Sequence, residues 1–252
     1  MAHKSFFTIL KTEAILYMRG FFGPFFSFAF PVMMLLLFGS IYGNDPTPFY
    51  GGKGAMDVGV PSYLGLVIAV SGLMSLPLQL AEYQTNHVYK RFDATPVGKE
   101  KIIAAQLSLY FFASFIGSLM LILIGKSVYH IHIDGSPVLI IIVFLLSLVS
   151  MFSIGFFIAA VFKNAKIINL VSYLLYFLML FTSGATIPVE LFPDHVKFFT
   201  RFMPLTHAVE ILKHSFAGNW QHENWISVII LSVISLVCGT TGIIFYRRRR
   251  WS

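Results

Sequence analysis

Histidine side chains are the groups in this sequence that come closest to forming a metal site. His130 and His132 are two residues apart, with Asp134 beside them, and further histidines follow at positions 207, 214 and 222. Imidazole nitrogens bind zinc, but a catalytic zinc site holds three protein ligands together. No third ligand close in the sequence completes either group. We therefore expect ordinary loop histidines and no bound metal.

The second chemistry to look for is nucleotide hydrolysis, which needs a loop of the form Gly-x-x-x-x-Gly-Lys-Ser/Thr to hold phosphate. The nearest approach is Gly125-Lys126-Ser127, where Met120 occupies the position of the required first glycine. The serines and threonines of the long apolar runs have no basic partner in their own run, so we expect packing roles for them. We expect no catalytic residues, no cofactor on this chain and no enzymatic activity.

Composition identifies the solvent that these residues face. The 252 residues are 57% hydrophobic and only 12% charged, whereas soluble domains carry about 25% charged residues. A water-soluble globule with so few charges could not cover its own surface. The sequence therefore predicts an integral membrane protein.

Six stretches lack Asp, Glu, Lys and Arg and are long enough to cross a bilayer. They cover residues 20–44, 58–81, 102–125, 135–162, 167–189 and 224–246, and the fifth span itself should end near Gly184. Backbone polar groups in lipid must be satisfied within the segment, which favours helices. The predicted fold is an all-α integral membrane protein with six transmembrane helices. Because no span carries an ionisable side chain of the kind that ion-coupled carriers use, energy should come from another protein.

Basic residues are distributed unequally between the two sides of these spans. With the N-terminus inside, thirteen Lys and Arg residues face the cytoplasm and five face outward. Cytoplasmic loops carry the excess of basic residues, so both termini should be cytoplasmic. The tetrad at 247–250 then anchors the last span against lipid headgroups and is not expected to bind nucleic acid. The pattern suits a multi-pass protein of a bacterial plasma membrane.

Residues 1–19 are too polar to span. At the helical spacing of about 100° per residue, one third of the circumference is basic and polar: Lys4, Thr8, Lys11, Thr12 and Arg19. Most of the remaining surface is apolar, with Glu13 as an outlier. We expect an amphipathic helix lying in the cytoplasmic interface, the alternative being a frayed tail.

The cytoplasmic connection 82–101 combines charged residues with turn-forming residues. Thr95-Pro96 and Gly98 disfavour helix, because the residue before a proline avoids the α region. The sequence therefore predicts one short helix over 82–92. A solvated charged loop is the alternative interpretation.

The external connection 186–223 is apolar for a loop, with aromatic and aliphatic residues throughout. Gly184 precedes it, and Pro188, Pro193 and Pro204 divide it into short pieces. Such a segment needs protein around it at membrane depth. We expect a pair of short re-entrant helices before the last span.

These two connections resemble those of the ABC-2 type transporter permeases. The stretch Tyr-Lys-Arg-Phe-Asp-Ala-Thr-Pro-Val at 89–97 is similar to the family's loop between the second and third spans, which ends in an Ala-Thr-Pro-like turn. The stretch 183–193 followed by Met-Pro-Leu-Thr-His at 203–207 resembles the segment after the fifth span. The resemblance extends over residues 1–252 as a single transmembrane domain. One departure is His87-Val88, where the family often has Gly-Thr.

The resemblance implies a permease subunit of an ATP-driven exporter, with ATP and Mg²⁺ bound by a separate ATPase subunit. It implies a second permease copy, either identical or related, and an amphipathic or hydrophobic cargo such as a drug, a peptide antibiotic or a lipid-linked molecule. It also implies a coupling helix that contacts the ATPase, through Glu82, Lys90, Arg91, Asp93, Thr95 and Pro96. Two alternatives stay open: a membrane scaffold or channel-like module without an ATPase, and a membrane-embedded transferase.

Overall fold

The computed structural model describes residues 2–93, 98–186 and 192–248. Its described part is helical apart from loops and one isolated bridge between Thr47 and Lys53. Six helices are long and apolar enough to span a membrane: Phe25–Tyr42, Ala55–Thr85, Lys99–Val128, Pro137–Val161, Ala165–Thr182 and Asn224–Arg248. The predicted all-α membrane fold with six spans is therefore confirmed.

The chain enters the bundle through an outlying helix. Helix α1 (Ala2–Arg19) packs against α7 (Lys99–Val128) and ends at Gly20. A short α2 (Phe22–Pro24) and a π-helical turn η1 (Phe25–Ala29) lead into α3 (Phe30–Tyr42), which completes the first span. The sequence started this span at residue 20, whereas its apolar helix begins at Phe25.

The second span fills the middle of the bundle. It runs without a break through α4 (Ala55–Ala69), the π-helical turn η3 (Val70–Ser75) and α5 (Leu76–Thr85), and it is the most buried of the six. Its glycines allow this close packing: a Cβ added at Gly65 would lie 2.6 Å from Val209 Cγ2 of α11. The span therefore contacts most of the other helices, including α3, α7, α8, α9 and α11.

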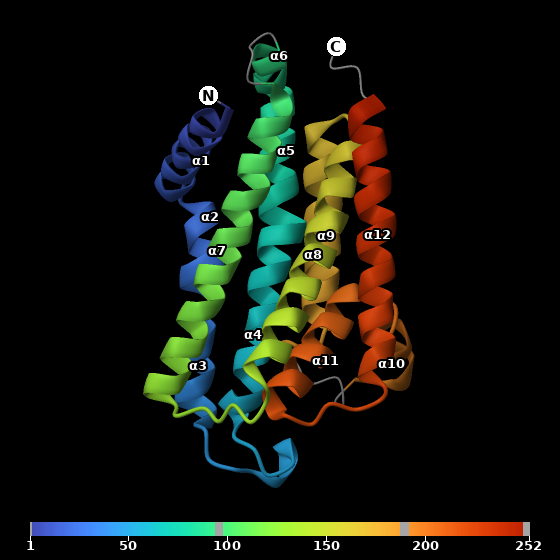
Figure 1. Cartoon of the computed structure of the whole chain (residues 1–252). Helices are drawn as coiled ribbons and strands as arrows, with labels where there is room; N and C mark the ends of the chain where they lie inside the picture. Colours follow the sequence, from blue (N-terminus) through green and yellow to red (C-terminus); the bar gives the residue numbers. More distant parts are fainter. Residues whose placement is uncertain (1, 94–97, 187–191, 249–252) are drawn as a thin grey trace.

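The remaining helices surround this central span. Helix α8 (Pro137–Val161) packs along α12 (Asn224–Arg248), and α9 (Ala165–Thr182) packs against α5. The fifth span ends at Thr182, close to the predicted end near Gly184. Both described chain ends and the short helix α6 (Val88–Asp93) lie at one end of the bundle (Figure 1).

The opposite end carries the long connection after the fifth span. This connection forms α10 (Asp194–Thr200) and α11 (Pro204–Ala217), as the expected pair of short helices. Helix α11 is embedded in the bundle, where it contacts α4, α8 and α12. Its apolar side is almost fully buried, through Leu205, Ala208, Val209, Ile211 and Leu212.

One local expectation was wrong. The sequence predicted a single helix over 82–92, but α5 ends at Thr85 and α6 begins at Val88. His87 takes a left-handed backbone conformation (φ 54°) between them. Few residues other than glycine adopt this region, and histidine is among those found there more often than most. The break lets α6 turn away from the axis of the central span.

Candidate functional site

Helix α6 is the candidate site, because it projects from the end of the central span (Figure 1). Lys90 and Arg91 are exposed on it, and Glu82 is exposed on the last turn of α5. A helix this short makes few hydrogen bonds of its own and depends on tertiary contacts. The tertiary contacts of α6 therefore determine how rigidly these charged side chains are positioned.

The inner side of α6 is anchored by one tyrosine. Tyr89 is 1% exposed, and its Oη donates a hydrogen bond to Oε1 of Gln106 on α7 at 3.1 Å. Its ring lies 6.0 Å from that of Tyr83 on α5. Val88 and Phe92 pack beside it against the core. Burial raises the pKa of Tyr89 well above its ordinary value, so the side chain stays a neutral donor.

A buried carboxyl group joins α1 to this anchor. Glu13 is 6% exposed, and its Oε1 accepts a hydrogen bond from Tyr83 Oη at 2.9 Å. Burial raises the pKa of Glu13, while hydrogen bonds from Tyr83 and Gln106 act in the opposite direction. Glu13, the outlier in the amphipathic pattern, is therefore a contact between the N-terminal helix and the central span.

A polar cavity of about 400 Å³ lies beside this contact, between α1, α5 and α7. Glu13, Tyr17, Gln79, Glu82 and Tyr83 contribute its polar groups. Burial raises the pKa of Tyr17 to about 12. This end of the bundle therefore holds a group of partly buried polar side chains behind the exposed helix α6.

Helix α5, which precedes α6, packs against the neighbouring span α8. Gln84 Nε2 on α5 donates to the carbonyl of Ala159 on α8 at 3.1 Å. Further along the span, a Cβ added at Gly155 of α8 would overlap the carbonyl oxygen of Gly72 in η3. The backbones of these two spans are therefore in direct contact at this point, with no side chain between them.

The predicted coupling residues are placed as follows. Glu82, Lys90 and Arg91 lie together at the α5–α6 end of the bundle. Asp93 is the last residue of α6. Thr95 and Pro96 fall outside the described residues.

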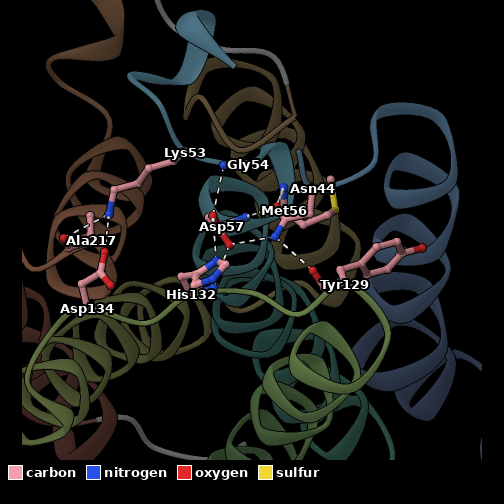
Figure 2. Close-up of polar contacts among 9 residues, drawn as sticks. All are labelled: Asn44, Lys53, Gly54, Met56, Asp57, Tyr129, His132, Asp134 and Ala217. Atoms are coloured by element: carbon pink, nitrogen blue, oxygen red, sulfur yellow. Dashed lines mark hydrogen bonds and ion pairs between the residues drawn. The ribbon is translucent and has the colours of Figure 1, made fainter. Parts of the chain in front are cut away.

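The opposite end of the bundle is closed by a hydrogen-bonded loop cluster (Figure 2). Asp57 Oδ1 accepts from Asn44 Nδ2 at 3.0 Å and from the backbone N–H of His132 at 2.9 Å, and Oδ2 accepts from Gly54 N at 3.0 Å. Asn44 Nδ2 also donates to the Tyr129 carbonyl at 3.0 Å. One carboxylate therefore ties two connections, α3–α4 and α7–α8, to the start of the second span.

The histidine pair with metal-like spacing belongs to this closure. His132 Nδ1 lies 3.8 Å from Asp57 Oδ2, and Asp134 pairs with Lys53 Nζ at 3.0 Å (Figure 2). Lys53 also donates to the Ala217 carbonyl at 3.1 Å. Among the described residues, no three His, Cys, Asp or Glu side chains are grouped as a metal site would require.

The structure places three of the four residues that were expected to shape the external segment. Gly184 has a left-handed φ of 75°, Pro193 precedes α10, and Pro204 is the first residue of α11. Lys213 Nζ donates to the Gly184 carbonyl at 3.0 Å, which links α11 to the end of the fifth span. Pro188 falls outside the described residues.

Sequence reasoning missed the polar contacts that position both ends. Glu13 and Tyr83 are 70 residues apart in the chain, and Asp57 and His132 are 75 apart. The one available signal was the position of Glu13 on an otherwise apolar side of its helix.

Comparison with known families agrees with this architecture. The model of the family described as ABC-2 type transporter matches residues 4–217, which include α6, the central span and both short helices of the last long connection. A search of the curated proteins found no match.

Proposed function

The chain belongs to the ABC-2 type transporter family, and on that premise we propose that it is the permease subunit of an ATP-driven exporter that works with a separate ATPase subunit. The observation that carries this proposal is the placement of α6. It presents Lys90 and Arg91 to solvent at the end of the most buried span, and Tyr89 holds it in place.

The coupling residues would be Glu82, Lys90, Arg91, Asp93, Thr95 and Pro96. We propose that α6 sits in a groove of the ATPase, which binds ATP and Mg²⁺. Closure of the ATPase would push α6, and the push would reach the spans through α5 and the backbone contact between η3 and α8. Conformational coupling needs an element that responds at both of its ends, and the continuous second span provides one.

A second copy of the permease is part of the proposal. The central span occupies the middle of the described bundle, so a path through a single chain would have to displace it. A path between two copies avoids that cost. The partner could be an identical chain or a related one.

An amphipathic or hydrophobic cargo, such as a drug, a peptide antibiotic or a lipid-linked molecule, fits the surface of the bundle. A groove of about 670 Å³ runs between α7, α8 and α12 and is lined chiefly by apolar side chains, with Glu100 and Arg247 among its polar lining residues. Such a surface accepts chains and rings from the lipid phase. This observation supports the cargo class and does not name a compound.

Orientation follows from the basic residues. The end that carries α6 also carries the start of α7, the α8–α9 connection and the end of α12, to which Lys99, Lys163 and Arg247 belong, in agreement with the thirteen-to-five asymmetry of the sequence. We propose that this end, with both termini, is cytoplasmic in a bacterial plasma membrane.

Charge reversal on α6 tests the coupling. We expect the double variant Lys90→Glu/Arg91→Glu to lose co-purification with the proposed ATPase subunit, because close interfacial charges set docking. We expect cargo-stimulated ATP hydrolysis in the reconstituted complex to fall about tenfold or more, which corresponds to about 1.4 kcal/mol. The measurement is the ATPase rate in liposomes together with the amount of ATPase recovered.

The matched control is Lys163→Glu/Lys166→Glu, which makes the same charge change in the α8–α9 connection and the first turn of α9, at the same end of the bundle. It should retain the ATPase. Normal coupling in the α6 variant would contradict the proposal. If no ATPase partner is found at all, the chain would fit a membrane scaffold or channel-like module instead.

A further inference from the structure

A second cavity lies at the end of the bundle away from α6, between α10, α11 and the end of α9. Its volume is about 370 Å³. Three basic side chains line it, Lys197, Arg201 and Lys213, together with one acidic side chain, Glu210. Nothing in the coupling mechanism above uses this cavity.

Among the described residues that line the cavity, lysine and arginine side chains outnumber the one carboxylate, Glu210. Lys197 Nζ lies 3.8 Å from Asp194, whose carboxylate is fully exposed to solvent, so this pair is weak. Glu210 accepts a hydrogen bond from Ser227 Oγ at 3.3 Å. Arg201 is exposed at the rim. The site therefore favours an anion over a cation.

The basic residues are held by the fold. The buried His207 bonds through Nε2 to the Arg201 carbonyl at 2.8 Å and through Nδ1 to Ser227 Oγ at 2.9 Å. Since a carbonyl oxygen only accepts, Nε2 is the donor in the bond to Arg201. This bond fixes the end of α10 against α11, and Lys213 is fixed by its bond to Gly184.

An apolar surface adjoins the basic cavity on α10 and the turn that follows it. Phe198, Phe199 and Phe202 are 58%, 61% and 65% exposed. Phe198 contacts the other two rings, with centroids 6.2 and 5.2 Å away. Exposed aromatic clusters beside basic residues are typical of helices that lie in a membrane interface. A ligand at this position would meet cations at its head and aromatic rings along its tail.

We propose that the cavity between α10 and α11 binds the phosphate group of an amphiphile, with Lys197, Arg201 and Lys213 around the phosphate and Phe198, Phe199 and Phe202 against its hydrocarbon chain. The guanidinium group of Arg201 suits phosphate because it donates two parallel hydrogen bonds. The amphiphile could be a phospholipid of that leaflet or an exported molecule, since the recognised chemistry is the same. The proposal does not depend on ATPase coupling.

Native mass spectrometry of the full chain in a non-ionic detergent tests the binding. Short-chain phosphatidylglycerol should bind, and the uncharged diacylglycerol of the same chain length should not. We expect Arg201→Ala to weaken phosphatidylglycerol binding about tenfold, because a hydrogen bond between charged groups is lost, and Arg201→Lys to weaken it less. Lys126→Ala removes an exposed charge from the same end of the bundle outside the cavity and should leave binding unchanged.

Two further measurements separate recognition of the phosphate group from recognition of the hydrocarbon chain, and test whether the variants fold. The double variant Phe198→Ser/Phe202→Ser should weaken the binding of phosphatidylglycerol. Inorganic phosphate should still compete with the phosphatidylglycerol that this variant binds. Thermal unfolding should show that both variants retain the fold. Equal binding by wild type and the Lys197→Ala/Arg201→Ala variant would overturn the proposal, and so would equal binding of diacylglycerol.

Lipid extracted from the purified protein identifies the source of the ligand. An ordinary phospholipid that is enriched on wild type and lost in Arg201→Ala would mark a lipid site. Another phosphate-bearing amphiphile with the same dependence on Arg201 would mark a cargo site. Both results support the cavity as a phosphate site, whereas no enrichment that depends on Arg201 counts against it.

Discussion

Single residues decide how the ends of this membrane bundle are held. The spans supply apolar surface almost everywhere, so the few buried polar groups carry much of the specificity of contact. Glu13 with Tyr83, Tyr89 with Gln106, and Asp57 with Asn44 are such pairs. Each joins two different elements of the bundle, and leaving one partner unsatisfied costs about 1–3 kcal/mol.

Glu13 gives the protein a dependence on pH. Burial raises the pKa of its carboxyl group in the folded state, so the folded protein binds this proton more tightly than the unfolded chain does. The stabilising contribution is therefore complete below the ordinary pKa and is lost as pH rises through the raised one. Glu13→Gln keeps an acceptor for Tyr83 and removes the titration.

We expect wild-type thermal stability in detergent to decline as the pH rises above the ordinary carboxyl pKa of 4.5 and through the raised pKa of Glu13, and the Glu13→Gln variant to show a flatter profile over the same range. Lys11→Gln, a change at an exposed position of the same helix, serves as the control and should keep the wild-type slope. Parallel profiles for wild type and Glu13→Gln would show that another group titrates.

At the scale of helices, α6, the second span and α8 are connected in series. Helix α6 is separated from α5 by the left-handed His87, yet it stays attached to the bundle through Tyr89. The continuous second span then passes beside α8, where Gly72 and Gly155 bring the two backbones together. Small residues permit this approach between helices in a membrane, and larger ones would separate them.

Gly155→Ala tests that contact. The added methyl group would overlap the Gly72 carbonyl, so we expect destabilisation of about 1–3 kcal/mol and weaker coupling of ATP hydrolysis to cargo. Gly239→Ala on α12 is the matched control, because its added Cβ would come no closer than 3.4 Å to Ser153 Oγ. Thermal unfolding of the two variants provides the comparison. If both melt alike, the η3–α8 contact is looser than the backbone geometry indicates.

At the scale of the whole molecule, the buried second span leaves no clear room for a cargo inside one described bundle. We therefore expect the purified permease to be a dimer. Light scattering coupled to size-exclusion chromatography, corrected for detergent, should give twice the mass of one chain. A mass of one chain that persists in the complex with the ATPase would contradict a path between copies.

The sequence by itself determined that this is a six-span helical membrane protein, because runs without charged residues need no tertiary information to be recognised. It also located the two connections that identify the family, and it placed the break after the fifth span near Gly184. These features depend on local composition and on where proline and glycine interrupt the helices. Both are properties of the segment itself and do not depend on how it packs.

Only the tertiary structure decided which face of each span is buried, that α5 and α6 are separate, and that Glu13 contacts Tyr83. The sides of a lipid-exposed helix are apolar all round, so hydrophobic periodicity does not indicate which side meets protein. Placing the second span at the centre likewise required every other helix. Lys197, Arg201 and Lys213 were scattered loop charges in the sequence, and the packing of α10 on α11 made them one cavity.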